Sequence, residues 1–538
     1  MKVLLWYTDK YYLVNQVYPL GLSLVADHLR KRGHTVTVEY PFLPDTDFKK
    51  NIRDAINRID PDVVGIGIRN LDTCMSCEEY GDFKGNDYQT FYFLPRVKEV
   101  IAEVKRTIPR IPIVVGGGGF TISPVAILKY LGLSYGIIGE GEEPFLQFIE
   151  AFPDKHKISQ IPNMVYPCDK GYSINPRRPY AFSPNSAQFH REPKFNFSYQ
   201  TNGIPVLVKR GCNQACSYCV EPLIEGNKFV FRSIDDVIDE LKAIAESSWE
   251  TGTIFFVDTE FNVPDLGYGS ELVSAILEAG LHEHFRFVSQ FIPKRFDLDF
   301  AKRLAEAGFS VVFSCESFSD TILEKNQVSY RESDIIKAIE TCDKVGIHCT
   351  VTLIFGLPGE TYETIDYTLR RIKEYPVGLL RAYEYTVGGR IYQGTPLCNN
   401  VEKNNPSKNL YGTKSEGYLL PYYYCAPASP FEVNEYIKQV FPDLLSYQNK
   451  YDEGTHQCLA IAYLSDQTLW DEAVELFVTT GTAVQASIYD YLFKRLVAAQ
   501  REDKAKTISL TLLDKIESGE LVDPGQAHMI KFYLSCLG

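Results

Sequence analysis

Three closely spaced cysteines are the residues of this sequence with the clearest chemical use. They lie in Lys209-Arg210-Gly211-Cys212-Asn213-Gln214-Ala215-Cys216-Ser217-Tyr218-Cys219, a C-x3-C-x2-C pattern with an aromatic residue before the third cysteine. Three thiolates on one loop can bind three irons of a [4Fe-4S] cluster and leave the fourth iron without a protein ligand. An open metal position can bind a reactant. The alternative is a zinc knuckle, but zinc normally takes four ligands, and no other Cys or His lies near in the sequence.

The cysteine motif opens a region in which strand patterns alternate with helix patterns. We expect strands at 206–209, 253–257, 286–290, 310–314, 349–355 and 379–383. Six β-α units predict a partial (β/α)6 TIM barrel, whose active site lies at the carboxyl ends of the strands. Glu260, Glu316, Ser317, Gly356 and Glu360 follow these strands, and the carboxylates there can pair with a cationic ligand. Alternatively, each carboxylate caps the next helix or pairs with a lysine.

The first 155 residues also alternate strands and helices. Strands are expected at 3–7, 35–39, 63–68, 113–115 and 135–138, and helices at 20–32, 48–59 and 91–108. This order predicts a doubly wound, Rossmann-like parallel sheet with its ligand beyond the carboxyl ends of the strands. Gly116–Gly119 and Gly139-Glu140-Gly141 fall at that edge, where glycine lets a large ligand approach the backbone. The alternative is that these glycines form turns that serve packing only.

Together these motifs resemble the radical S-adenosylmethionine (SAM) superfamily. Asp258-Thr259-Glu260-Phe261-Asn262, Cys315–Asp320, Phe355–Thr361 and Gly389–Leu397 are similar to segments of its cobalamin-linked branch, so the resemblance covers residues 1–400. It implies a [4Fe-4S] cluster on Cys212, Cys216 and Cys219, which with Glu260 are the catalytic residues. Glu260 would lie near the open iron. It also implies SAM contacts from Tyr218, Glu260, Glu316, Ser317, Gly356 and Glu360.

The glycine runs and Tyr18-Pro19-Leu20-Gly21-Leu22 resemble the cobalamin-binding domain of that branch. The resemblance implies cobalamin contacts from Arg69, Asn70, Gly117, Gly118, Gly139, Glu140 and Gly141. Many such domains place a cobalt-binding His after the first strand, but here Thr8–Val14 has Tyr11 at that position. We therefore expect base-off cobalamin without a His lower ligand. Arg69 beneath the ring cannot ligate cobalt; it would instead favour a four-coordinate, easily reduced metal, unless it serves as a salt-bridge partner or ribose contact.

The resemblance implies a cobalamin-dependent radical SAM C-methyltransferase, similar to class B. Such an enzyme transfers a methyl group from SAM via methylcobalamin to a carbon of a small-molecule or peptide substrate, and it needs an external low-potential electron donor. Arg69-Asn70-Leu71-Asp72 without a lower His resembles the tryptophan 2-C-methyltransferase group, which favours an indole-like substrate. Two alternatives stay open. The enzyme could be a ring cyclase or ring-contraction enzyme that does not methylate, or its N-terminal domain could have lost cobalamin.

Composition limits the function classes and gives a domain plan. The 538 residues carry a net charge of −14, which argues against nonspecific binding to nucleic acid or anionic membranes. No apolar run approaches the ~20 residues needed to span a bilayer, and the cysteine usage is typical of a reduced compartment, so we expect a cytoplasmic protein. The predicted regions are a cobalamin-binding domain at 1–155, a linker at 156–200, the barrel at 201–400 and a mostly helical region at 401–538.

Overall fold

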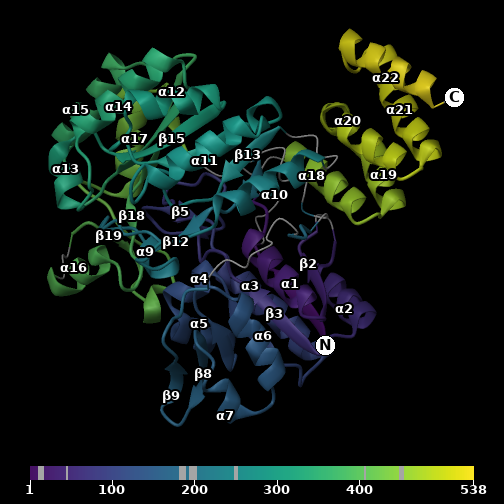
Figure 1. The fold of residues 1–538 in the computed structure, drawn as a ribbon, viewed down its shortest axis with the longest axis horizontal. Helices are drawn as coiled ribbons and strands as arrows, with labels where there is room; N and C mark the ends of the chain where they lie inside the picture. The colour runs from purple at the N-terminus through teal and green to yellow at the C-terminus, as the bar shows by residue number, and fades with distance from the viewer. Residues whose placement is uncertain are drawn as a thin grey trace.

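The computed structural model describes residues 1–9, 17–43, 46–180, 189–192, 195, 203–246, 252–404, 408–447 and 453–537. A parallel sheet forms the first part of the chain, below the barrel in Figure 1. Its strand order β2-β1-β3-β6-β7 joins β1 (Lys2–Tyr7), β2 (Thr35–Glu39), β3 (Val63–Gly67), β6 (Ile113–Gly116) and β7 (Tyr135–Ile137). Buried apolar runs such as Val3-Leu4-Leu5-Trp6 form these strands because helices cover both faces of a doubly wound sheet. The predicted Rossmann-like fold is confirmed.

The three predicted helices of this domain lie close to their expected positions, as α1 (Leu20–Lys31), α2 (Phe48–Ile59) and α3 (Leu94–Thr107). Three further helices were not predicted: α4 (Gly118–Ile122), α5 (Pro124–Leu131) and α6 (Glu142–Ala151). Helix α3 begins at Leu94 rather than at Phe91, because Pro95 occupies its first turn, where proline is favoured. The preceding residues 68–93, which we call the crossover loop, carry the short hairpin β4 (Phe83–Lys84) and β5 (Gln89–Thr90).

The expectation of an irregular segment at 156–200 is wrong for its first part. After α7 (Lys155–Ile158), β8 (Met164–Cys168) and β9 (Gly171–Ile174) form an antiparallel hairpin that extends the sheet beyond β7. The turn Asp169-Lys170-Gly171 permits the hairpin, since Gly171 has φ +112°. Residues 181–188, 193–194 and 196–200 of the predicted linker lie outside the described residues.

The second sheet is the predicted partial barrel. Six parallel strands follow in order: β10 (Ile204–Val206), β13 (Thr253–Phe256), β14 (Arg286–Phe291), β15 (Phe309–Glu316), β16 (Cys349–Phe355) and β17 (Arg381–Val387), with short β21 (Leu445–Ser446) beside β17. The helices that follow the strands include α10 (Ile234–Glu246), α11 (Gly267–Glu278), α12 (Leu298–Glu306), α14 (Glu332–Val345) and α15 (Tyr362–Glu374). Stacked rings of Phe256, Phe287 and Phe309 lie among its core side chains.

The first and last strands of the barrel depart most from their predicted positions. The first barrel strand ends at Val206, and Lys209–Arg210 form a separate strand, β11, that pairs with β12 (Val230–Phe231). The last strand spans Arg381–Val387 instead of the predicted 379–383. Gly378 pairs with Arg381, so residues 379 and 380 lie in a turn before the strand. Short helices α9 (Glu221–Ile224) and α13 (Asp320–Lys325) follow the cysteine loop and β15.

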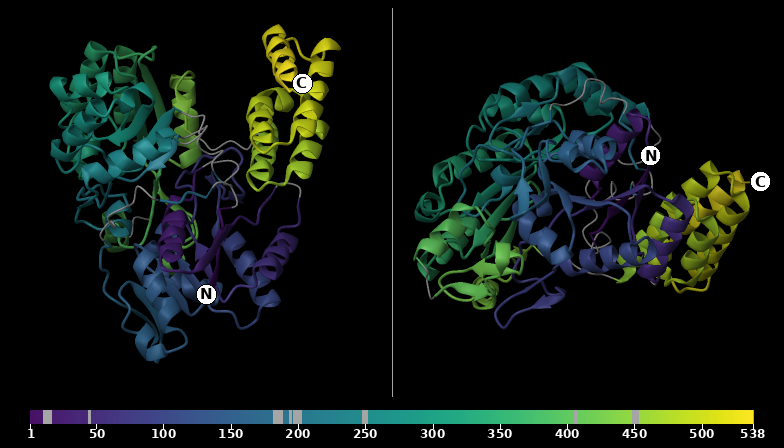
Figure 2. Two further views of the ribbon diagram at one scale, coloured as in Figure 1. Left: turned by 45° about the vertical axis from the view of Figure 1, so that its right-hand side comes forward. Right: turned by 90° about the horizontal axis from the view of Figure 1, so that it is seen from below.

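The region beyond the barrel is mostly helical, as expected, and it also contains three short strands. A small antiparallel sheet has the order β18-β20-β19, from β18 (Gly389–Arg390), β19 (Leu410–Gly412) and β20 (Tyr422–Tyr424). Helices α16 (Pro396–Asn404) and α17 (Pro430–Val440) accompany it, and α18 (Glu453–Asp466), α19 (Trp470–Thr479), α20 (Thr482–Ala498), α21 (Glu502–Glu517) and α22 (Pro524–Cys536) complete the chain. Figure 2 shows the last of these helices, in yellow, projecting away from the barrel. Among the described residues, no helix combines the length and apolar character needed to cross a membrane.

Candidate active site

The cysteine loop follows β11 and is held by its own backbone. The Cys212 amide donates to the Gly226 carbonyl at 2.9 Å, and the Cys219 amide donates to the Cys216 carbonyl at 3.2 Å. Gly211 has φ +104°, and a Cβ there would lie 2.3 Å from the Lys228 carbonyl oxygen, so only glycine fits. Cys212 is buried, and Cys216 and Cys219 are half-buried.

The electrostatics of the three thiols fit a positively charged cofactor. Burial raises the pKa of each thiol, and for Cys216 the nearby Glu316 and the two other thiols raise the pKa further. A bound metal supplies the positive charge that makes such thiols thiolates. Within the described residues, no three His, Cys, Asp or Glu side chains are arranged to bind a single metal ion. Three cysteines match the three protein-bound irons of a [4Fe-4S] cluster, whereas zinc normally takes four ligands.

Two buried carboxylates face these thiols from the ends of two barrel strands, β13 and β15, which lie on either side of β14. Glu260 follows β13, and Glu316 ends β15 at a register shift, with a left-handed φ of +50°. The Oε2 atom of each is buried and has no hydrogen-bond partner among the described residues. Burial raises the pKa of Glu260 to about 8 and that of Glu316 to about 7. An unpaired buried carboxylate is costly, so the site fits a cationic ligand such as an ammonium or a sulfonium.

The structure assigns different surroundings to the other predicted SAM residues. The Tyr218 hydroxyl donates to the Glu316 carboxylate. The Ser317 hydroxyl already contacts Thr368 Oγ1 at 3.1 Å and accepts from the Ser319 amide at 3.0 Å. Ser317 therefore stabilises the start of α13 within the protein.

Gly356 and Glu360 lie together at the end of β16. The Gly356 amide donates to Glu360 at 3.3 Å, and Thr364 also donates to this carboxylate. Gly356 has φ +89°, and a Cβ there would lie 2.6 Å from Cys425 Sγ. Glu260, Glu316 and Glu360 thus lie at one edge of the barrel, as the sequence predicts.

A buried lysine, missed in the sequence, holds Glu260 in place. Lys209 Nζ lies 3.1 Å from Asp258 Oδ2, with both side chains 1% exposed, and it also donates to the Glu260 carbonyl. The Thr259 hydroxyl donates to the Gly211 carbonyl at 3.0 Å. The end of β13 is therefore fastened to the start of the cysteine loop. The sequence feature that could have indicated this role is the position of Lys209, three residues before Cys212.

The predicted cobalamin residues Arg69 and Asn70 line a crevice at the carboxyl ends of β1 and β3. The crevice is lined by Thr8, Asp9, Ile68, Arg69, Asn70, Phe93 and Val97, and its empty space of about 170 Å³, which includes open solvent, leaves no room for a buried water molecule. Arg69 Nη1 lies 3.5 Å from Asp9 Oδ2, so the salt-bridge interpretation of Arg69 has a partner in the structure. A large ligand would extend beyond this crevice. Tyr11, at the position of the missing His, lies outside the described residues.

The predicted glycines of the first domain have packing uses. Gly117 has φ +102°, and a Cβ there would lie 2.4 Å from the Ile68 carbonyl oxygen. The Gly119 amide donates to the carbonyls of Ile68 and Arg69, at 3.1 and 2.8 Å. A Cβ on Gly118 would lie 3.3 Å from the Arg69 carbonyl oxygen. These glycines therefore let α4 lie directly against the loop that carries Arg69.

The second glycine run lies against a basic residue of the predicted linker. Gly139 has φ +64°, and its Cβ would lie 2.6 Å from Arg177 Nε. Glu140 binds Arg177 at 2.8 Å, and Gly141 precedes α6 beside Val25. Arg177 lies in Pro176-Arg177-Arg178-Pro179, and the composition of this segment indicates only a linker. Its contact with Glu140 could therefore not be predicted from the sequence.

These contacts bring the two predicted sites together. Arg210, directly before the cysteine loop, binds Glu142 of α6 at 2.5 Å, and both side chains are buried. Arg177 Nη1 donates to the Leu223 carbonyl of α9 at 3.2 Å. Figure 1 shows α9 above α4, between the first sheet and the barrel. The carboxyl edge of the first sheet therefore meets the cysteine loop.

Comparisons with known proteins agree with this architecture. Residues 206–372 match the family model described as the Radical SAM superfamily. The chain is 25% identical over 430 residues to a tryptophan 2-C-methyltransferase of Streptomyces laurentii, covering 67% of this chain and 69% of the relative. It is also 25% identical over 397 residues to an uncharacterised methyltransferase of Pyrococcus horikoshii, covering 72% of this chain and 79% of the relative.

Two solved enzymes share the fold at low identity. The radical SAM methyltransferase TsrM of Kitasatospora setae, solved with cobalamin and a [4Fe-4S] cluster, has a TM-score of 0.70 at 20% identity and covers 88% of this chain and 99% of its own. The cobalamin-dependent SAM radical enzyme OxsB, solved with aqua-cobalamin and SAM, has a TM-score of 0.64 at 14% identity and covers 99% of this chain and 83% of its own. At these identities the two structures establish the fold.

Proposed function

We propose that this chain, which belongs to the radical SAM superfamily through its domain at residues 206–372, is a cobalamin-dependent radical SAM C-methyltransferase. The observation that carries the proposal is the meeting of two sites. The cysteine loop lies beside two carboxylates that each keep one oxygen without a partner among the described residues, and the Arg210–Glu142 ion pair joins this loop to the carboxyl edge of a Rossmann-like sheet. Relatives named as methyltransferases support the methyl-transfer class.

Each residue set would have a distinct task. Cys212, Cys216 and Cys219 would hold the [4Fe-4S] cluster, and Glu260 would lie beside its open iron. Tyr218, Glu316 and Glu360, with Ser317 and Gly356 at the same edge, would hold and orient SAM. When bound, the cluster would bind and activate SAM, and cobalamin would carry the methyl group to the substrate carbon.

The first domain would bind cobalamin at its carboxyl edge. Arg69 and Asn70 line the crevice there, and the glycine segments Gly117-Gly118 and Gly139-Glu140-Gly141 flank it in the sheet. No His stands between His34 and His156 in the sequence, so the ring would bind without an imidazole from that stretch. Arg69 would place a positive charge at this edge, held by Asp9.

The proposed substrate class is a small molecule or peptide with an indole or similar aromatic ring. The support comes from the tryptophan 2-C-methyltransferase relative and from a TsrM structure solved with tryptophan and a SAM analogue. An external low-potential donor would reduce the cluster. The second candidate is a cobalamin-dependent radical SAM enzyme that does not methylate, such as a ring cyclase or a ring-contraction enzyme.

The test is anaerobic reconstitution with iron, sulfide and hydroxocobalamin, followed by mass spectrometry of the SAM products in the presence of tryptophan. We expect one S-adenosylhomocysteine for each methylated product. Deoxyadenosine alone would indicate the non-methylating candidate, and protein without a corrinoid spectrum would show that the first domain does not bind cobalamin. Cys216→Ala should lose both the cluster absorbance and turnover. The control Cys458→Ala, which changes a half-buried cysteine on α18, should keep both.

A further inference from the structure

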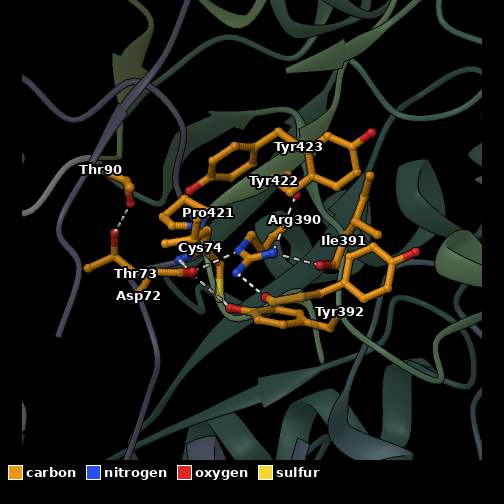
Figure 3. A network of polar contacts seen from close by, with 12 residues as sticks. Asp72, Thr73, Cys74, Thr90, Arg390, Ile391, Tyr392, Pro421, Tyr422 and Tyr423 are labelled. Carbon is orange, nitrogen blue, oxygen red and sulfur yellow. Dashed lines mark hydrogen bonds and ion pairs between the residues drawn. The ribbon is translucent and has the colours of Figure 1, made fainter. Parts of the chain in front are cut away.

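A buried ion pair joins the crossover loop to the segment after β17 (Figure 3). Asp72 Oδ2 lies 2.7 Å from Arg390 Nε, and the two side chains are 0% and 2% exposed. Asp72 Oδ1 accepts from the Tyr392 hydroxyl at 2.8 Å and from the Cys74 amide at 3.0 Å. Both carboxylate oxygens are therefore used, which fixes the orientation of Asp72.

The guanidinium of Arg390 is fixed as firmly as its partner. Its nitrogens donate to the carbonyls of Ile391 at 2.6 Å, Tyr418 at 2.9 Å and Tyr422 at 3.4 Å. It lies over the Tyr392 ring at 4.6 Å. A buried ion pair of this kind adds little to stability compared with apolar packing, but it can specify one arrangement of the parts that it joins.

On the side of the first domain, Asp72 fixes the end of the segment that carries Arg69 and Asn70. Arg69 precedes Asp72 by three residues, and its carbonyl accepts from the Gly119 amide at 2.8 Å. The segment is thus held by α4 near one end and by Arg390 at the other. Arg69 and Asn70 lie between these two anchors and line the crevice of the first sheet.

On the barrel side, the segment that carries Arg390 rests on the cysteine loop. A Cβ added to Gly389 would lie 3.9 Å from Tyr218 Cβ, and the Leu397 amide donates to the Ser217 carbonyl at 2.8 Å. Ser217 and Tyr218 stand between Cys216 and Cys219. A continuous set of contacts therefore runs from Arg69 through Asp72 and Arg390 to the cysteine loop.

We propose that Asp72 and Arg390 are positioning residues that set the placement of the cobalamin-binding edge relative to the cluster and SAM. The proposal rests on the proposed function. Neutral contacts beside the pair keep the crossover loop attached to the barrel: Ser76 Oγ donates to the Val387 carbonyl at 2.5 Å, and the Tyr423 hydroxyl donates to the Met75 carbonyl at 3.0 Å. Loss of the ion pair would therefore alter the placement without separating the domains.

The test uses Asp72→Asn and the double variant Asp72→Asn with Arg390→Gln, each reconstituted as the full chain. The single variant leaves a buried guanidinium without its counter-ion, whereas the double variant removes both charges and so guards against simple misfolding. We expect the double variant to bind cobalamin and the cluster at wild-type stoichiometry. Its magnetic interaction between cob(II)alamin and the reduced cluster, measured by electron paramagnetic resonance, should change. Its turnover should fall on the order of 100-fold, as expected for a small misplacement of reacting groups.

Glu103→Gln is the matched control. Glu103 is a buried acid on α3 of the same domain, paired with Arg53 at 2.8 Å and Arg106 at 2.5 Å. The Glu103→Gln variant should have a lower free energy of unfolding than the wild type. Its magnetic interaction and its turnover per loaded enzyme should equal those of the wild type. A double variant with the wild-type interaction and rate would overturn the positioning role while leaving the proposed function intact. Wild-type protein that binds no cobalamin would overturn both.

Discussion

At the scale of single residues, the site is defined by acids that the fold buries without pairing both of their carboxylate oxygens. Glu260 and Glu316 each keep an oxygen without a hydrogen-bond partner among the described residues, and burial raises the pKa of both. Glu316 also has a left-handed backbone, which is costly for a residue other than glycine. Perturbed carboxylates at strand ends are typical of binding or catalytic groups. A cationic ligand bound beside these carboxylates would offset the free-energy cost of burying them.

Glu360 allows a test of this electrostatic cost without the cluster. Burial raises the pKa of Glu360 to about 7, above an unfolded value of about 4.3. Its protonated form therefore supports folding below the unfolded pKa, and this contribution is lost as pH rises through 7. The shift corresponds to about 4 kcal/mol. We expect Glu360→Gln apoprotein to exceed the wild type in stability by up to this amount at pH 8 and not at pH 4, as measured by thermal unfolding across pH. Parallel pH profiles would contradict the buried-acid interpretation.

Arg69 tests the lower face proposed for cobalamin. An arginine cannot ligate cobalt, whereas an imidazole at the same position can. We expect Arg69→His to shift the visible spectrum of bound cobalamin toward that of a His-ligated form. Arg69→Met, which also removes the pair with Asp9, should leave the spectrum of a cobalamin without a His ligand. Identical spectra for the wild type and both variants would place Arg69 away from cobalt.

At the scale of elements, the contact between α4 and the crossover loop depends on a glycine. Gly117→Ala would place a Cβ 2.4 Å from the Ile68 carbonyl oxygen at φ +102°. We expect a loss of about 1–3 kcal/mol in unfolding free energy and weaker cobalamin binding, because Ile68 and Arg69 must move. Equilibrium unfolding and cobalamin titration measure the two effects.

Gly21→Ala is the control for that variant. Gly21 lies in α1, and a Cβ there would meet no atom within 4 Å. Alanine is favoured over glycine inside a helix by roughly 1 kcal/mol, so this variant should be at least as stable as the wild type. If Gly117→Ala binds cobalamin as well as the wild type does, the close packing at Gly117 does not determine the shape of the ligand edge.

Elements whose signal is local could be predicted from the sequence. Strand β16 and helix α15 occupy their expected residues, Cys349–Phe355 and Tyr362–Glu374, because one is a buried apolar run and the other begins at a Thr361 cap. The hairpin β8–β9 could not be predicted from the sequence, because its partly exposed strands have no apolar run. Its position depends on pairing with β7. The cysteine loop could be found in the sequence because its three cysteines lie within eight residues. Asp72 and Arg390 are 318 residues apart, and nothing local marks them as partners.

At the scale of the whole molecule, the C-terminal helices attach through an aromatic cluster on the first domain. Tyr463 of α18 is fully buried, its ring lies 5.8 Å from that of Tyr40 and 6.1 Å from that of Phe195, and its hydroxyl donates to the Tyr40 carbonyl at 3.5 Å. Tyr40 directly follows β2. Residues 453–537 thus contact the first domain at a place distant in sequence from the cysteine loop.

We therefore expect Tyr463→Ala to destabilise the protein by about 3–5 kcal/mol, the range for loss of a large buried side chain. Urea unfolding followed by tryptophan fluorescence measures the change. Phe532→Ala, which alters a side chain that is 60% exposed on α22, should stay within about 0.5 kcal/mol of the wild type. Equal effects of the two changes would argue against an anchoring role for Tyr463.

The separation of Asp72 from Arg390 has a consequence for biogenesis. A ribosome releases the first domain hundreds of residues before the arginine emerges, so during translation the aspartate is hydrated and the segment beside it has only one of its two anchors. The nascent first domain can form its sheet, but the Asp72–Arg390 contact at its ligand edge forms only when the segment after β17 packs against it. Cobalamin would then bind in the cell only after the chain is complete. A truncated chain would fold its first domain but would lack the Arg390 contact at the ligand edge.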